Sequence, residues 1–160
     1  MAGGLRLTQA VTIRPCEERD LEHFDVLASP NHLAYCRAEF ARGPGALTIL
    51  VAVDEGDVPV GKLHLDFENR AAERAAVLIA AAVTPTLRGR GIGTVLMGAA
   101  EELVSSRGFD AILLGVEDSN PRARRLYERL GYEAFARDEF EYLGAPVPNP
   151  GVWMRKELAC

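Results

Sequence analysis

The spacing of the hydrophobic residues changes repeatedly along the chain, and each change marks a different kind of element. Short, almost continuous apolar runs such as residues 48–53 and 111–116 are typical of buried strands. Residues 62–67 alternate between polar and apolar side chains, which predicts a strand with one exposed face. The expected strands are residues 11–14, 48–53, 62–67, 75–83, 111–116, about 134–143 and about 152–158.

Other segments place apolar residues three or four positions apart, the spacing of an amphipathic helix. The clearest helix begins at Ile92 and closes at Gly108, whereas Asn120 opens another as its N-cap and Gly131 ends it. The expected helices are residues 20–28, 31–41, 92–107 and 120–130. The order β-α-α-β-β-β-α-β-α-β-β predicts a single mixed α/β domain over residues 1–160, with a proline-rich loop at 144–151.

Composition narrows the class of protein. With 48% hydrophobic and 26% charged residues, the chain has the balance of an ordinary globular domain. A net charge of -5 argues against nucleic acid as a partner, because phosphate backbones attract basic surfaces. No apolar run approaches the roughly 20 residues of a membrane helix, and the N-terminus has no long apolar signal segment. The three cysteines form no C-x-x-C pair, so we expect a cytoplasmic protein without a metal.

A glycine-rich turn directly precedes the helix that begins at Ile92. Residues 83–93 read V-T-P-T-L-R-G-R-G-I-G, and the three glycines lack a Cβ atom, so this backbone can approach a ligand closely. The first N–H groups of the helix have no partner inside it and carry partial positive charge. With Arg88 and Arg90 as additional donors, the segment is typical of a phosphate-binding cradle.

Two better-known nucleotide motifs do not fit. A dinucleotide fingerprint requires a third glycine where this chain has Thr94. Residues 56–62 approach a P-loop, but Leu63 replaces the hydroxyl residue that binds the metal, and a strand pattern follows instead of a helix. The cradle therefore belongs to a different class of phosphate site.

A second motif lies about 30 residues further on, where residues 120–132 read N-P-R-A-R-R-L-Y-E-R-L-G-Y. Together the two motifs resemble the GCN5-related N-acetyltransferase (GNAT) superfamily. Its cradle pattern, Gln/Arg-x-x-Gly-x-Gly/Ala, is matched by Arg88, Gly91 and Gly93, and its later Asn, Tyr and Leu-Gly-Phe/Tyr elements are all present. The resemblance extends over the whole expected element order.

The resemblance implies that acetyl-CoA lies in a V-shaped gap between two central parallel strands, which end here at Val83 and Val116. The pyrophosphate would rest on the backbone of the cradle, and the pantetheine arm would pair with the edge of the first strand. The implied cofactor contacts are Ala81, Val83, Arg88, Gly89, Arg90, Gly91, Ile92, Gly93, Thr94 and Asn120.

The resemblance also implies direct attack of an amine on the thioester in a ternary complex. A strand N–H freed by a bulge near Leu78 or Ile79 could stabilise the oxyanion. Tyr127 is the candidate acid that protonates the departing thiolate, because a phenol has a pKa of about 10. The alternative is that Tyr127 is a core aromatic on an apolar helix face.

The general base is less clearly marked. Several GNAT enzymes carry a glutamate inside the strand before the cradle, but residues 76–83 contain no carboxylate. Glu73 precedes this strand and Glu117 follows the next parallel one, so either could act through a water chain. The alternative is that both are ordinary surface carboxylates.

For the acceptor, the acidic balance favours a small cationic amine, steered by carboxylates near the expected cleft. These carboxylates are Glu39, Asp66, Glu68, Glu73 and Glu117. Two alternatives stay open: a non-catalytic acyl-CoA-binding or sensing module on the same fold, and a transferase acting on protein N-termini or lysines. Homodimer formation also stays open.

The remaining polar residues are weaker candidates. The histidines at positions 23, 32 and 64 show no metal-ligand spacing, so we expect structural or solvated side chains and no metal site. A run of arginines on the second motif could contact the 3′-phosphate of CoA or simply form a solvated helix face. These arginines are Arg122, Arg124, Arg125 and Arg129.

Overall fold

The computed structural model describes residues 10–41, 47–141 and 147–158. Within these residues the strands form one seven-stranded sheet with the order β1-β2-β3-β4-β5-β7-β6. The strands are β1 (Thr12–Pro15), β2 (Leu47–Val53), β3 (Pro59–Asp66), β4 (Ala75–Val83), β5 (Ala111–Glu117), β6 (Glu133–Phe140) and β7 (Asn149–Glu157). The helices are η1 (Glu18–Val26), α1 (Pro30–Ala41), η2 (Ala71–Glu73), η3 (Pro85–Leu87), α2 (Ile92–Ser106) and α3 (Pro121–Arg129).

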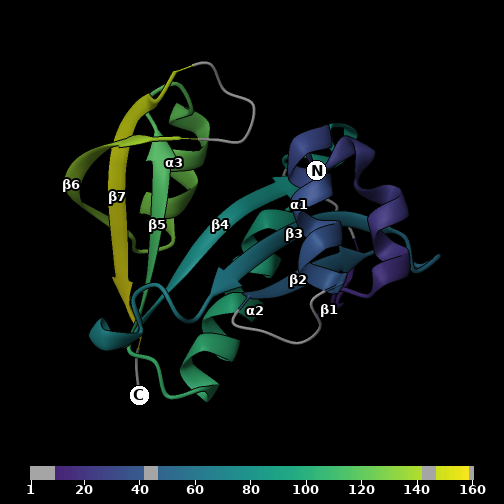
Figure 1. The fold of residues 1–160 in the computed structure, drawn as a ribbon, viewed down its shortest axis with the longest axis horizontal. Helices are drawn as coiled ribbons and strands as arrows, with labels where there is room; N and C mark the ends of the chain where they lie inside the picture. Colours follow the sequence, from purple (N-terminus) through teal and green to yellow (C-terminus); the bar gives the residue numbers. More distant parts are fainter. Residues whose placement is uncertain (1–9, 42–46, 142–146, 159–160) are drawn as a thin grey trace, which may run out of the picture.

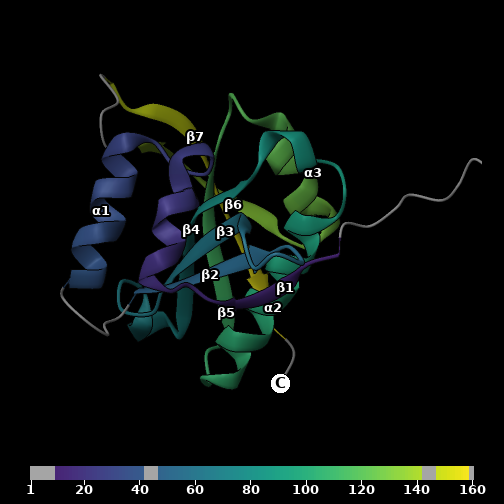
Figure 2. The same cartoon turned by 90° about the vertical axis from the view of Figure 1, so that its right-hand side faces the viewer.

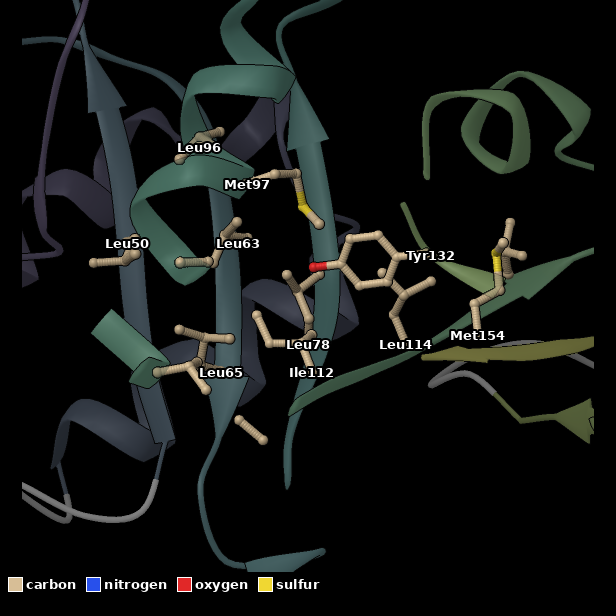
Figure 3. Packing of buried hydrophobic residues seen from close by; sticks show 14 of the residues in the cluster. Leu50, Leu63, Leu65, Leu78, Leu96, Met97, Ile112, Leu114, Tyr132 and Met154 are labelled. Carbon is tan, nitrogen blue, oxygen red and sulfur yellow. The ribbon is translucent and has the colours of Figure 1, made fainter. Parts of the chain in front are cut away.

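Helices cover both faces of the sheet. Figure 2 shows η1 and α1 on one side, with α2 and α3 on the other. The larger core lies under α2, where Leu96 and Met97 pack against Leu63 of β3 and Leu114 of β5 (Figure 3). A second core of Leu21, Phe24 and Cys36, among others, joins η1 and α1 to the opposite face. The expected mixed α/β fold and its element order are confirmed.

The first expected helix, at residues 20–28, has a different form. It is the 3-10 helix η1. The buried residues Leu21 and Phe24 within it and Leu27 at its C-cap recur every three positions, which is the period of a 3-10 helix. Asp20 fixes its start by accepting hydrogen bonds from the backbone N–H of Glu17 at 2.7 Å and from the guanidinium of Arg14. A spacing of three residues fits an α-helix nearly as well as a 3-10 helix, so the sequence predicts a helix here but not its type.

The expectation of an exposed face on β3 is wrong. Leu63 and Leu65 face the core under α2, as the alternation predicted, but Lys62 and His64 are 1% and 0% exposed. The elements η1 and α1 cover the face to which these two polar side chains point. Sequence alternation assigns residues to faces but does not reveal whether another element covers a face.

The two central strands separate along their length. β4 and β5 pair in parallel only from Ala75 opposite Ala111 to Leu78 opposite Leu114, although both strands continue beyond that point. Figure 1 shows them close together at the lower end of the picture and diverging above it. The expected V-shaped splay between them is therefore present.

A bulge in β4 lies at the start of the splay. His64 of β3 pairs with Ile79 and Lys62 pairs with Ala82, so two steps along β3 match three steps along β4. Ala80 takes up the extra residue with a φ of 55°, a left-handed conformation that is costly for alanine. The bulge was expected near Leu78 or Ile79, and its extra residue, Ala80, directly follows them.

The C-terminal strands differ in their limits. β6 ends at Phe140, and β7 begins at Asn149, inside the segment 144–151 that was expected to be a loop. Pro150 fits there because it lies at the start of β7, one residue before Gly151, which is the first residue of β7 that pairs with β5. Residues 142 and 143 of the expected strand, residues 144–146 of the expected loop, and Cys160 lie outside the described residues. No helix in the described part of the chain is long and apolar enough to cross a membrane.

Candidate functional site

A pocket of about 890 Å³ lies where β4 and β5 diverge, on the face of the sheet that α2 and α3 cover. Its walls are the far end of β4, the turn before α2, and one side of α3. Ala80 and Ala81 of β4 are exposed although β4 is a central strand, because β5 no longer pairs with β4 beyond Leu78 and Leu114. The splay therefore opens the middle of the sheet to a ligand.

The turn before α2 forms the floor of the pocket. Gly89 and Gly91 have φ values of 79° and 86°, a left-handed conformation that favours glycine and bends the chain into the helix. Gly91 is the N-cap of α2 and no side chain caps the helix start, so its first N–H groups stay available to an anion. The guanidinium of Arg122, from α3, lies near Gly89 and adds positive charge.

Helix α3 supplies the opposite wall. Asn120 caps it, because its Oδ1 accepts a hydrogen bond from the backbone N–H of Ala123 at 3.2 Å. The structure divides the arginines of this helix into two groups. Arg122, Arg125 and Arg129 line the pocket, whereas Arg124 lies 3.8 Å from a carboxylate oxygen of Glu128.

Tyr127 also lines the pocket from α3, and it is half-buried. Its ring packs edge-on against Tyr132 with 6.0 Å between the ring centroids. Burial raises the pKa of Tyr127 above its usual value, so its phenol is protonated at neutral pH. Tyr132 differs, because it is buried and its hydroxyl donates to Glu101 at 3.2 Å.

The pocket brings together most of the candidate residues named from the sequence. They are Ala81, Val83, Arg88, Gly89, Gly91, Ile92, Gly93, Thr94, Asn120 and Tyr127. Arg90, Glu73 and Glu117 are not part of its lining. Glu73 precedes β4 at the end opposite the pocket and forms an ion pair with Arg70 at 2.9 Å. Glu117 ends β5, and its carboxylate accepts a hydrogen bond from Ser119 at 3.3 Å.

The carboxylates expected to attract a cationic acceptor do not gather at this pocket. None of Glu39, Asp66, Glu68, Glu73 and Glu117 belongs to the lining that the described residues form. Asp66 ends β3 beside the start of β4, where its carboxylate accepts the backbone N–H groups of Glu68 and Asn69. The charged side chains in the lining are arginines, which suit the phosphates of a cofactor.

A polar cluster that the sequence did not reveal lies on the opposite face of the sheet, beneath α1. The Nζ of Lys62 lies 3.2 Å from His32 Nε2 and 3.3 Å from His64 Nε2, and it donates to the carbonyl of Ala80 at 2.6 Å. The three N–H groups of a lysine ammonium therefore face three acceptors. The only signal in the sequence was the polar pair on β3, which had been assigned to solvent.

The charges in this cluster follow from burial. Burial lowers the pKa of Lys62 to about 8, and burial together with Lys62 lowers the pKa of His32 to about 4. The pKa of His64 is also held well below its ordinary value by the same two causes. At neutral pH both imidazoles are therefore neutral, and each can accept a hydrogen bond from the Lys62 ammonium.

The same cluster resembles a metal site in one respect. His32, Cys36 and His64 offer ligand atoms within 4.8 Å of one another, although their spacing in the sequence gave no such indication. The Lys62 ammonium, however, lies about equally far from both imidazole Nε2 atoms, where an ion bound by them would have to lie. We therefore interpret the cluster as an ammonium site.

Curated proteins with similar sequences include acetyltransferases. A mycothiol acetyltransferase of Rhodococcus jostii is 32% identical over 108 residues, which are 66% of this chain and 35% of the relative. The chain spans about a third or less of the length of the mycothiol acetyltransferases that it matches.

Solved structures share the fold. The ribosomal-protein-S18-alanine N-acetyltransferase from Escherichia coli has a TM-score of 0.74 at 21% identity, covering 94% of this chain and 96% of that one. A phosphinothricin acetyltransferase from Sinorhizobium meliloti, in complex with AcCoA, has a TM-score of 0.74 at 22% identity, covering 92% and 88%. Residues 13–132 of this chain match the acetyltransferase (GNAT) family. The chain belongs to that family.

Proposed function

We propose that this chain is an acetyl-CoA-dependent N-acetyltransferase that acts on the primary amine of a small molecule. One observation carries the proposal: a single pocket unites the glycine cradle, the unpaired edge of β4 and the phenol of Tyr127. The first can hold a pyrophosphate, the second a pantetheine arm, and the third can donate a proton. Each matches one part of a reacting thioester cofactor.

For cofactor binding, the pyrophosphate would rest on the N–H groups at the start of α2, with Arg88 and Arg122 close to it. The pantetheine arm would pair with Ala81 and Val83, whose edge has no partner strand after Leu78. The side-chain amide of Asn120 borders the same pocket. Arg125 and Arg129 supply further positive charge for the 3′-phosphate.

For the transfer step, the acceptor nitrogen must first lose the proton that makes it an ammonium. Its lone pair then attacks the thioester carbon, and the carbon–sulfur bond breaks. Tyr127 donates its proton to the departing thiolate and recovers one from the nitrogen, which forms the amide. Two protons leave the nitrogen in total, one ending on the CoA thiol and the other in solvent.

The acceptor is the least defined part of the proposal. A small cationic amine was expected from the acidic balance, and that expectation now rests on the net charge of -5 alone. The cofactor occupies the α2/α3 face in this proposal, so the acceptor would approach through the splay from the face of η1 and α1.

A thiol-release assay with purified protein, acetyl-CoA and a panel of amines tests the activity. The panel should contain polyamines, aminoglycoside-like amines, neutral and acidic amino acids, and peptides with free N-termini. We expect amine-dependent release of CoA, with an acetylated product of the expected mass. Higher rates with neutral or acidic amino acids than with polyamines would contradict the cationic preference but not the transfer itself.

The competing function is a non-catalytic module that binds acyl-CoA. The same protein, titrated with acetyl-CoA in a calorimeter, separates the two. Binding without thiol release for any member of the panel would favour the module, whereas absence of binding would contradict both functions.

A further inference from the structure

The buried cluster around Lys62 has a direct connection to the pocket through the bulge in β4. Lys62 Nζ donates to the carbonyl of Ala80, and Ala81, the next residue, lines the pocket on the other face of the sheet. A single peptide group therefore separates the ammonium from the place where the thioester would lie.

The direction of this peptide group follows from the strand pairing. The backbone N–H of Thr84 donates to Val60 at 2.8 Å, and Ala82 pairs with Lys62, so these residues of β4 face β3. Neighbouring residues of a strand direct their N–H groups to opposite edges. The N–H of Ala81 therefore faces β5, at the edge where the β4–β5 ladder has already ended.

The carbonyl of Ala80 and the N–H of Ala81 belong to the same planar peptide. In a trans peptide these two groups point in opposite directions, and the described residues contain no cis bond. A hydrogen bond that fixes the carbonyl toward β3 and Lys62 therefore fixes the N–H toward the splay. Ala80, whose carbonyl accepts from Lys62, is also the residue with the left-handed φ of 55°.

We propose that Lys62 is a positioning residue for acetyl transfer, holding the Ala80–Ala81 peptide so that the N–H of Ala81 donates to the thioester oxygen of acetyl-CoA. This inference rests on the proposed function. His32 and His64 hold the Lys62 ammonium in place, because each accepts one of its remaining N–H groups. The positive charge of the Lys62 ammonium beside the carbonyl also polarises the peptide group. The N–H of Ala81 is therefore a stronger donor to a developing oxyanion.

Infrared difference spectra of bound acetyl-CoA, isotope-labelled at the thioester carbonyl, test this inference without any acceptor. In the native protein we expect the carbonyl band at lower frequency than in free acetyl-CoA, because a hydrogen bond weakens the bond. In K62M that shift should be largely lost, while the calorimetric affinity for acetyl-CoA stays within about twofold, since the phosphate contacts lie elsewhere.

The matched control is K156M, which makes the same change in a lysine of β7. Lys156 is ion-paired with Glu101 at 2.8 Å and lies on β7, which pairs with β5 and β6 and not with β4, so its removal should leave the band shift intact. With the most reactive amine of the panel, K62M should lower kcat at nearly unchanged KM for acetyl-CoA. The decrease should not exceed the roughly 10²–10³-fold that losing one oxyanion donor costs.

A pH titration of the native protein gives a second readout that needs no variant. Among the described residues, four titratable groups face Lys62: His32 and Cys36 from α1, His64 from β3, and Cys16 from the segment before η1. Both imidazoles are already neutral at pH 7, and burial raises the pKa of both thiols, to about 12 for Cys16.

Between about pH 7 and about pH 9, Lys62 is therefore the member of this cluster expected to change its charge. The band shift should diminish as the pH rises through the Lys62 pKa of about 8. Native protein that does not bind acetyl-CoA would contradict the proposed function. Native protein that binds it, with a band unaffected by both K62M and pH, would overturn the role of Lys62 alone. Lost turnover with an unaffected band would likewise overturn it, because Lys62 would then act on the acceptor.

Discussion

At the scale of single residues, two neighbouring tyrosines differ in what their hydroxyl groups contact. Tyr127 lines the pocket, whereas the hydroxyl of Tyr132 is bound to Glu101 inside the core. Their rings are in edge-on contact, so the two side chains share much of their surroundings. Removing each hydroxyl in turn therefore compares a proposed proton donor, Tyr127, with a structural phenol, Tyr132.

We predict that Y127F lowers kcat by about 10²–10⁴-fold, the usual range for general acid catalysis, with little change in the KM for acetyl-CoA. The phenol would act mainly when thiolate charge develops, which is why kcat should carry the effect. Steady-state kinetics with the most reactive amine provide the measurement. Native turnover in Y127F would return Tyr127 to the role of a core aromatic.

Y132F is the control, with the opposite expected pattern. It removes the hydrogen bond to Glu101, so the free energy of unfolding should fall by about 1–2 kcal/mol in a denaturant titration. Its kcat should stay close to the native value. A large loss of turnover in Y132F would show that packing, rather than a phenol in the pocket, explains the Tyr127 effect.

At the scale of elements, helix α2 joins the cofactor site to the core. Its first turn borders the pocket, and its buried side chains pack on β2, β3 and β4. Two glycines of this helix lie in different places: Gly93 lines the pocket in the first turn, whereas Gly98 lies further along and is exposed. An added Cβ would contact Leu126 at an ordinary 3.5 Å at Gly93 and nothing within 4 Å at Gly98.

We predict that G93D weakens CoA binding at least about tenfold, or roughly 1.4 kcal/mol, because a carboxylate would occupy the anion site. The unliganded fold should tolerate it, since a negative charge in the first turn suits the helix dipole. G98D should bind CoA with nearly native affinity. Calorimetry of both variants checks this, and equal affinities in G93D and G98D would contradict a phosphate site at this helix start.

At the scale of the whole molecule, the larger core under α2 and the smaller core under η1 and α1 lie on opposite faces of one sheet, and the Lys62 cluster lies under α1 on the smaller side. The two histidines of this cluster make the free energy of unfolding depend on pH. Their pKa values are lowered in the folded state, so the unfolded chain binds more protons below about pH 6.5.

We therefore predict that the free energy of unfolding decreases as the pH falls from about 7 to about 5, a range above the usual titration of carboxylates. In H32Q the decrease should be smaller, because one of the two titrating groups is gone. Denaturant titrations at a series of pH values measure the slope. An identical slope in H32Q and the native protein would contradict neutral burial of His32.

The sequence by itself determined those parts of the protein whose residues follow one another along the chain. The cradle at residues 83–93 and the Asn120–Tyr127 motif each form one local structure, so spacing predicted the start of α2 and the cap of α3, and the family resemblance that the two motifs carry implied about half of the residues that line the pocket. The order of elements followed from periodicity, because a buried strand and an amphipathic helix each require their own spacing of apolar residues.

Only the tertiary structure decided what covers each face. Lys62 and His64 occupy polar positions of an alternating strand, and nothing local indicates that η1 and α1 bury them against His32. The position of the bulge at Ala80 was likewise set by the pairing of β4 with β3, not by an alanine-rich sequence that favours no single register. Glu73 lies near the cradle in sequence but at the other end of β4, because an extended strand carries its two ends far apart.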